Sequence, residues 1–217
     1  MRWHRDEDEL IRLDEEDPDE DEEEEEQEDH RGEEDDKLQE KMLKTRTVLV
    51  SEAITDEVAR KIFQQLLVLE SDSKEKPITV VINSPGGEAD SGFGIHDMLR
   101  FVEMPVRTLV AGLCASAAVI VFLAGDKGKR FSLPNSRFLL HQPSSQSFGQ
   151  ASDLEIASKE IAKLRERYNR IVADKTGRDI ETITKDSDRD FWLSAKEAKE
   201  YGLVEHMVTH RSEIGDD

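Results

Sequence analysis

Residues 78–87 read Ile-Thr-Val-Val-Ile-Asn-Ser-Pro-Gly-Gly, an apolar run followed by two adjacent glycines. The run predicts a buried central strand. Glycines at its end tolerate a positive φ and carry no side chain, so backbone N–H groups there can approach a ligand closely. Such N–H groups can hold the oxyanion that forms during acyl transfer. With a serine, a histidine and an aspartate in later stretches, this sequence favours a serine hydrolase.

The segments around this strand alternate between strand and helix patterns, which is the order of a βαβ unit and predicts an α/β domain. A helix that begins near 114–116 and runs to 124 is expected after the last of these strands. Before it, the spacing of apolar residues predicts strands at 47–50 and 106–111 and helices at 59–69 and 92–102.

The second half of the chain supplies a predicted hairpin and a long helix. Residues 130–133 and 138–140 alternate as the two strands of a short hairpin, and His141 stands at its end. From Leu154 the apolar positions keep helical spacing for about five turns, and Gly177 is placed to stop the helix. A helix of this length in a domain of this size favours docking against another subunit.

Acidic residues are concentrated at the N-terminus. The 217 residues carry a net charge of −20, of which residues 1–40, with 23 acidic and 5 basic side chains, contribute −18. So few apolar residues cannot offset the entropy cost of ordering this segment, and it is predicted to be a disordered tail. Three roles of this tail stay open: a solvated extension that aids solubility, a propeptide that is removed, or a gate over an opening. Its charge disfavours nucleic-acid binding, because polyphosphate would repel it.

The rest of the sequence predicts one domain at 41–211 and a flexible C-terminus at 212–217, without export or membrane segments. The N-terminus has charges but no apolar core of a signal peptide. The single cysteine, Cys114, is expected to be a packed thiol, excludes an internal disulfide and fits a reducing compartment, the cytoplasm. Residues 108–125 hold 18 positions without formal charge, but their small residues favour a buried strand and helix over a membrane span.

Residues suited to acyl transfer stand in favourable places. Ser116 opens a helix of small residues, so the N–H of Ala117 would point toward an attacked carbonyl. His141 ends a buried strand and is well placed as a general base, whereas His96 is expected on the polar side of its helix. An aspartate among residues 186–190 would orient the imidazole. A metal site is not expected, because a single cysteine cannot build a thiolate cage.

Taken together, the chain resembles the family of the ATP-dependent Clp protease proteolytic subunit (ClpP) over about residues 43–211. A chance match of this set of motifs is negligible. In chain order, they are Ile82-Asn-Ser-Pro-Gly-Gly87, Ala115-Ser116, Gly125-Asp-Lys-Gly-Lys-Arg130, Leu133-Pro-Asn-Ser136, His141-Gln-Pro143, Gly149-Gln-Ala151, Asp188-Arg-Asp190 and residues 194–204.

The resemblance gives each candidate a role. It implies that Ser116 is the nucleophile, His141 the general base and acid, and Asp190 the carboxylate that orients His141. The family's oxyanion donors correspond to the backbone N–H groups of Gly87 and Ala117. Substrate contacts are expected at Gly87, Glu88, Ala89, Gln142 and Pro143. Contacts between rings are expected at Gln150, Asp153, Asp188 and Arg189.

The family also implies a fold and an assembly. The fold is α/β and similar to crotonase: a spiral of ββα units with a projecting handle, a strand and a long helix, here including residues 146–173. Family members form two stacked seven-subunit rings that enclose the serines, and an AAA+ unfoldase feeds unfolded proteins into them. The resemblance thus implies a serine endopeptidase subunit that cuts unfolded polypeptides to short peptides. No cofactor is expected, because the unfoldase uses the ATP.

Three departures from the family pattern keep a second hypothesis open. Ala117-Ala118 replaces the usual Met-Gly after the nucleophile, and Glu88-Ala89-Asp90 replaces two apolar cleft residues after the double glycine. The acidic tail replaces the usual axial-loop sequence. The alternative is a catalytically weak ring subunit in a mixed assembly with a paralogue. An acyl-CoA enzyme of the crotonase fold has no support, because that chemistry does not require this Ser, His and Asp set.

Overall fold

The computed structural model describes residues 37–38, 40–144 and 148–215. The chain divides into two compact units, Met1–Lys41 and Met42–Asp217, and the second carries the features discussed below. Nearly all of the predicted acidic tail and the last two residues of the predicted flexible C-terminus lie outside the described residues.

Strands of the second unit form one sheet with an almost wholly parallel arrangement. Strands β1, β2, β3, β4 and β7 follow one another across the sheet in parallel, β5 pairs in parallel with β3, and β6 pairs antiparallel with β5. The bounds are β1 Thr47–Val50, β2 Ile78–Ser84, β3 Val106–Ala115, β4 Arg130–Ser132, β5 Arg137–Leu140, β6 Phe191–Ser194 and β7 His206–Met207.

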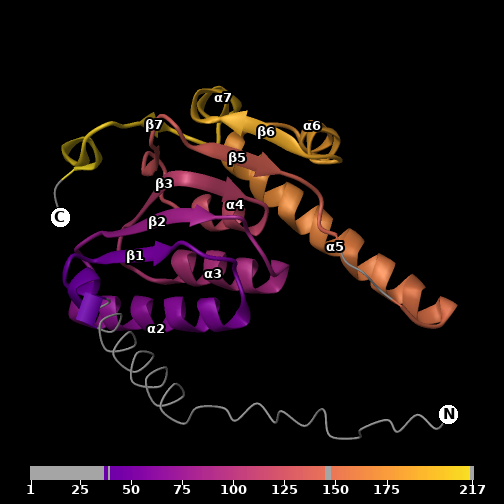
Figure 1. Ribbon diagram of the computed structural model, residues 1–217, viewed down its shortest axis with the longest axis horizontal. Helices are drawn as coiled ribbons and strands as arrows, with labels where there is room; N and C mark the ends of the chain where they lie inside the picture. Colours follow the sequence, from indigo (N-terminus) through magenta and orange to yellow (C-terminus); the bar gives the residue numbers. More distant parts are fainter. Residues whose placement is uncertain (1–36, 39, 145–147, 216–217) are drawn as a thin grey trace, which may run out of the picture. The chain divides into compact units, whose positions relative to one another are not determined.

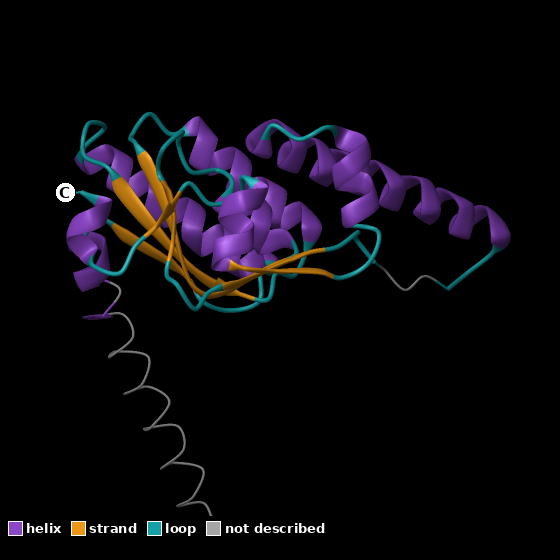
Figure 2. Ribbon diagram, turned by 90° about the horizontal axis from the view of Figure 1, so that it is seen from above, coloured by secondary structure: helices purple, strands orange, loops and turns teal. Residues whose placement is uncertain are grey.

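Helices α2, α3, α4 and α5 lie on one face of this sheet (Figure 2). Helices α2 and α3 connect β1 to β2 and β2 to β3, so the predicted βαβ order is confirmed. The bounds are α2 Asp56–Asp72, α3 Ala89–Phe101, α4 Ala117–Phe122, α5 Ala151–Thr176, α6 Ile180–Asp186, α7 Ala195–Tyr201 and a 3-10 turn at Arg211–Ile214.

Strand β3 has a bulge in its middle. It pairs with β2 on both sides of the bulge, while on its other edge it pairs with β4 before the bulge and with β5 after it. Its pairing with β2 jumps from Ile82 opposite Val110 to Ser84 opposite Cys114, so residues 111–113 bulge opposite Asn83. Gly112 lies in this bulge with φ 117°, and a Cβ there would come 2.5 Å from Oδ1 of Asn83. The predicted strand end at 111 was therefore too early, because the glycine marks a bulge rather than a strand end.

The predicted hairpin is wrong. Strand β4 pairs with residues 108–110 of β3, and β5 pairs with residues 113–115 of the same strand beyond the bulge. Both connections are parallel, so β4 and β5 continue the sheet along two successive parts of β3. The alternating pattern was that of half-buried strands, but it carried no information on which strand is the partner.

The uncharged segment 108–125 is a buried strand and helix, as predicted. Every residue of α4 is buried, at 5% exposure or less, and Cys114 is fully buried. Burial in these apolar surroundings raises the pKa of the Cys114 thiol far above its ordinary value. In the part of the chain that the structure describes, none of the helices is long and apolar enough to cross a membrane.

The expected position of His96 on a polar face is also wrong. His96 is buried at 8% exposure, and its Nδ1 lies 2.7 Å from the carbonyl oxygen of Ile120 on α4. Because a carbonyl only accepts, Nδ1 carries the hydrogen in this contact. Helix α3 packs against both α2 and α4, so more of its surface is covered than its apolar stripe alone predicts. Burial lowers the pKa of His96.

Helix α5 extends beyond the sheet (Figure 1). Its C-terminal half packs on the body through Tyr168, Asn169, Val172 and Ala173, and it stops at Gly177, whose φ of 73° suits the left-handed cap. Leu154 and Ile156 near its start are 41% and 60% exposed. The strand expected beside it falls partly on residues 145–147, outside the described residues, and the described neighbours on either side are not in a strand.

Candidate active site

Ser116 stands between β3 and α4 in an unusual backbone conformation. Its φ and ψ are 56° and −124°, a region that non-glycine residues rarely adopt and that costs about 1–3 kcal/mol. Hydrogen bonds hold it there, because its N–H donates to the carbonyl of Leu139 at 2.9 Å and its carbonyl accepts from Val119 at 3.0 Å. Strain of this kind collects at functional sites. The observed conformation therefore supports Ser116 as a reactive residue.

The double glycine brings the end of β2 against Ser116. A Cβ at Gly86 would lie 2.5 Å from the carbonyl oxygen of Ala115 and 2.9 Å from the backbone nitrogen of Ala117. Its φ of 88° is a second reason why a side chain does not fit. Only glycine permits this approach, so the loop after β2 and the start of α4 form one wall of the site.

Gly87 presents its own N–H group away from the neighbouring chain segment. Ile54 donates to the carbonyl of Gly86 and accepts from the N–H of Glu88, both at 2.8 Å, in a short parallel bridge around Gly87. In such a bridge the central residue directs its N–H to the opposite side. A Cβ at Gly87 would lie 2.2 Å from the carbonyl oxygen of Ile54. The N–H of Gly87 is therefore left free of Ile54, on the side of the cavity described below.

His141 and Asp190 are brought together by the pairing of β5 with β6. Leu140 faces Phe191 in this antiparallel ladder, so the residues one step beyond, His141 and Asp190, lie opposite each other. Nδ1 of His141 is 3.7 Å from Oδ1 of Asp190, within ion-pair range but longer than a hydrogen bond. Contacts of this kind in an unliganded site often tighten when substrate binds.

The loop before Asp190 is attached to α5 and to the segment after His141. Oδ1 of Asp188 accepts from Arg165 at 3.0 Å, and Arg165 also donates to the carbonyl of Thr184 at 3.1 Å. The side-chain amide of Gln142 donates to the carbonyl of Asp188 at 2.7 Å. Sequence reasoning missed Arg165, because its position on a long polar helix face gives no sign of its partner.

A cavity of about 660 Å³ joins the predicted residues. Its lining includes Ser116, Ala117, His141, Gly87, Glu88, Ala89 and Pro143, all of which were predicted from the sequence. Gln142 is not among the described residues that line it and instead holds the Asp188 loop. Asp190 lies behind His141, on the side of the ring that carries Nδ1.

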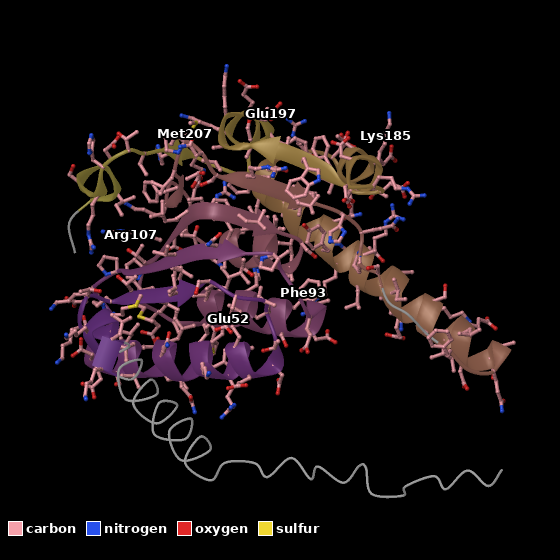
Figure 3. All side chains as sticks on the ribbon, viewed as in Figure 1. Glu52, Phe93, Arg107, Lys185, Glu197 and Met207 are labelled. Carbon is pink, nitrogen blue, oxygen red and sulfur yellow. The ribbon has the colours of Figure 1, made fainter. Side chains whose placement is uncertain are left out.

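The floor of the cavity is apolar and includes a tyrosine that sequence reasoning did not single out. Phe93 on α3 (Figure 3), Ile120 on α4 and Tyr168 on α5 are 2%, 0% and 4% exposed. The hydroxyl of Tyr168 donates to the carbonyl of Ser116 at 3.4 Å, and burial raises its pKa, so it stays protonated. The helical spacing marked position 168 as inward, but the contact with Ser116 needs the tertiary structure.

The four residues expected at a contact between rings lie at two places. Gln150 precedes α5 and its carbonyl accepts from Asp153 at 3.0 Å, while Asp188 and Arg189 belong to the loop before Asp190. Their role in assembly stays a prediction. Among the described residues, none of the groups of His, Cys, Asp and Glu side chains is arranged to hold a metal ion.

The chain is similar to known proteins over most of its length. Residues 30–211 match the family model described as Clp protease. The chain is 48% identical over 181 residues to ATP-dependent Clp protease proteolytic subunit 2 of Treponema denticola, which covers 83% of this chain and 90% of that protein. It is 44% identical over 191 residues to proteolytic subunit 3 of Rhizobium etli, covering 84% of this chain and 98% of the relative.

A solved structure agrees with these relatives. The fold is similar to that of a ClpP1 point mutant from Listeria monocytogenes, with a TM-score of 0.76 and 45% identity, covering 82% of this chain and 99% of the other. The α/β ClpP fold predicted from the sequence is therefore confirmed. The chain belongs to the Clp protease family and is a serine protease subunit of the Clp type.

Proposed function

We propose that this chain is an active serine endopeptidase subunit with Ser116, His141 and Asp190 as its catalytic triad. The observation that carries the proposal is that Ser116, His141 and the N–H side of Gly87 border one cavity, with Asp190 behind His141. A nucleophile, a base and a backbone donor around one space are the parts that acyl transfer requires. The strained backbone of Ser116 is a further sign of a reactive residue.

The first half of the reaction forms an ester. Oγ of Ser116 attacks the carbonyl carbon of the peptide bond while Nε2 of His141 takes the hydroxyl proton. Asp190 keeps the hydrogen on Nδ1 and stabilises the charged imidazole. The N–H groups of Gly87 and Ala117 stabilise the oxyanion of the tetrahedral intermediate. His141 then gives its proton to the leaving amine, the C–N bond breaks, and the acyl group remains on Ser116.

The second half returns the enzyme to its starting state. A water molecule attacks the ester carbonyl while His141 takes one of its protons. The oxyanion forms again beside Gly87 and Ala117, and its collapse releases a carboxylic acid. The proton on His141 returns to Oγ of Ser116. No cofactor is needed for either half, since all proton transfers use His141.

The substrate is proposed to be an unfolded polypeptide that lies along Gly87, Glu88 and Ala89, with Pro143 on the other side of the cavity. Gln142 is proposed to hold the loop before Asp190 through its side-chain amide, and its contact with substrate stays a prediction. An extended chain suits this place, because the bridge between Gly87 and Ile54 keeps the loop backbone extended and rigid.

The proposed assembly is a double ring of copies of this chain or of this chain with a paralogue. The exposed apolar side chains of Leu154 and Ile156 on α5 support contact with another subunit. The proposed contacts between rings are Gln150, Asp153, Asp188 and Arg189. The relatives are named as subunits of an ATP-dependent protease, so a separate AAA+ unfoldase is the proposed consumer of ATP. The cytoplasm is the proposed location, and the single buried thiol of Cys114 fits it.

Replacement of the triad tests the proposal. Ser116→Ala, His141→Ala and the double variant are compared with wild type on a fluorogenic peptide and on an unfolded protein. Each single variant should lower kcat by at least about 10³-fold, and the double variant should be no slower than the worse single one, because a triad acts as a unit. Ser71→Ala removes another serine hydroxyl, which donates to the carbonyl of Val68 on α2 at 2.7 Å, and serves as the control.

Two results would contradict the proposal. Retention of activity in Ser116→Ala would exclude Ser116 as the nucleophile. An assembled wild-type chain without peptidase activity toward any unfolded substrate would leave the alternative of a catalytically weak ring subunit.

A further inference from the structure

The rim of the substrate cavity carries negative charge. Glu88 and Asp90 line the cavity together with Ser116 and His141, and among the described residues that line it there is neither a lysine nor an arginine. Both carboxylates are on exposed residues. Oε2 of Glu88 accepts a hydrogen bond from the hydroxyl of Ser91 at 3.0 Å. This contact is with a neutral group, so it does not cancel the charge.

Two cations on the neighbouring helix α5 are occupied by other carboxylates. Arg167 on α5 lies over the ring of Phe93 at 4.0 Å, near the cavity floor, but its guanidinium is 3.4 Å from Oδ2 of Asp97. Lys163 on the same helix is 2.7 Å from Glu160. The ion pairs within the described part of the chain include neither Glu88 nor Asp90. The two rim carboxylates are therefore available to a ligand.

The interior of the same cavity is apolar. Phe93, Ile120 and Tyr168 form its buried floor, and Ile161 and Leu164 of α5 add further apolar side chains. An apolar interior below a negative rim matches a side chain that has a long alkyl stem and a cation at its end. Lysine and arginine bury their stems on apolar surface and keep the charged end in water, where Glu88 and Asp90 lie.

The position of Glu88 in the chain places this charge beside the reacting bond. Glu88 follows Gly87 directly, and the N–H of Gly87 is the proposed donor to the oxyanion. A substrate residue whose carbonyl reacts with Ser116 lies against this loop, and Glu88 lines the same cavity. The same carboxylate would repel an acidic substrate side chain at this place, so it favours one charge and disfavours the other.

We propose that Glu88 and Asp90 make this subunit select polypeptides with lysine or arginine beside the cleaved bond and reject those with glutamate or aspartate there. The proposal rests on the proposed endopeptidase function and names its substrate class. Each partly solvated carboxylate contributes roughly a two- to fivefold preference for a cation at low salt, because exposed ion pairs are weak. The preference decreases as salt screens the charges.

Both carboxylates also lie at the N-terminus of α3, where negative charge stabilises a helix. Helix α2 offers a matched control, because Asp56 occupies its first turn and does not line the cavity. Neutralising Asp56 removes the same kind of favourable contact with a helix end. A change in substrate preference that follows Glu88 and Asp90 but not Asp56 therefore reports on the cavity.

Three fluorogenic peptides that differ only at the residue before the cleaved bond test the proposal. This residue is lysine, norleucine or glutamate, and norleucine has the alkyl stem of lysine without the charge. For wild type at low salt, kcat/KM should follow the order lysine, norleucine, glutamate. The lysine to norleucine ratio should fall about two- to fivefold in Glu88→Gln and in Asp90→Asn, stay constant in Asp56→Asn, and decrease for wild type at 0.5 M salt.

The ratio is measured within each variant, so a general loss of rate does not mimic a loss of selectivity. A ratio that is equal in wild type, Glu88→Gln and Asp90→Asn, with norleucine peptide still cleaved, overturns the inference and leaves the peptidase function standing. Failure of wild type to cleave all three peptides, together with failure of a fluorophosphonate to label Ser116, overturns the proposed function and this inference with it.

Discussion

Replacing Gly87 by alanine should lower kcat by about 10²–10³-fold and should also destabilise the fold. A Cβ at this position would lie 2.2 Å from the carbonyl oxygen of Ile54 and 2.8 Å from its backbone nitrogen, so the bridge between the two segments must open. The φ of 153° at Gly87 adds strain for any residue with a side chain. Opening the bridge moves the N–H group that is proposed to stabilise the oxyanion.

The structure sets the magnitude of both effects. Two hydrogen bonds, from Ile54 to Gly86 and from Glu88 to Ile54, are lost or weakened, which costs about 1 kcal/mol each. Backbone strain adds about 1–3 kcal/mol, so the free energy of unfolding should fall by about 3–5 kcal/mol. Loss of one oxyanion donor lowers kcat by about 10²–10³-fold. Because the donor acts mainly in the transition state, KM should change much less.

The assay measures kcat and KM on a fluorogenic peptide at a temperature where the variant is folded by circular dichroism. Gly177→Ala is the control, since Gly177 also has a positive φ, 73°, but its added Cβ would meet no atom within 4 Å. That control should lose about 1 kcal/mol of stability and keep its kcat. A folded Gly87→Ala variant with kcat within about threefold of wild type would refute the role of the Gly87 N–H.

Two further predictions concern positioning and pH. Arg165→Ala removes the ion pair with Asp188 and loosens the loop that carries Asp190, so kcat should fall several-fold with little change in KM. Arg165→Lys should restore part of the lost kcat. Equal kcat in wild type, Arg165→Ala and Arg165→Lys would contradict the positioning role. Burial lowers the pKa of His96 below its ordinary value, so the unfolded chain binds this proton more tightly than the folded chain does. The free energy of unfolding should therefore fall as the pH drops below about 6.5. This group contributes at most about 1.4 kcal/mol per pH unit. In urea unfolding between pH 7.5 and 5.5, His96→Gln should show a smaller loss than wild type, and an identical loss would rule out His96 as its source.

Local patterns predicted the central strand and the long helix. The apolar run 78–82 became the core of a central strand, and the spacing from Leu154 to Gly177 became α5 with Gly177 at its end. Both signals are local, because the period of apolar residues and a glycine cap need no knowledge of the partner.

The pairing of strands, and the burial of a helix under two other helices, could not be predicted in the same way. The bulge at 111–113 depends on Asn83, whose Oδ1 accepts from Leu113 at 2.9 Å, and it decides that β5 pairs with β3. His96 is buried because two helices cover α3, although its own helix presents it as polar. Such features depend on contacts between residues far apart in the chain, which a periodicity along one segment does not contain.

The residues of the candidate site could be predicted from the motifs and from the resemblance to the family. The contacts that hold these residues in place could not. The N–H direction of Gly87 follows from its bridge with Ile54, and the attachment of the Asp190 loop follows from Arg165 and Gln142. These partners are ordinary polar or apolar residues of their segments. Their role is set by geometry, so only the folded structure shows it.

The identity of the acylated residue tests the account most directly. The full chain is treated with a fluorophosphonate probe, digested and mapped by mass spectrometry, beside Ser116→Ala and Ser71→Ala. We predict one modified residue, Ser116, with labelling lost in Ser116→Ala and kept in Ser71→Ala. Labelling that persists in Ser116→Ala, or that maps to another serine in the wild-type protein, would contradict the assignment of Ser116 as the nucleophile.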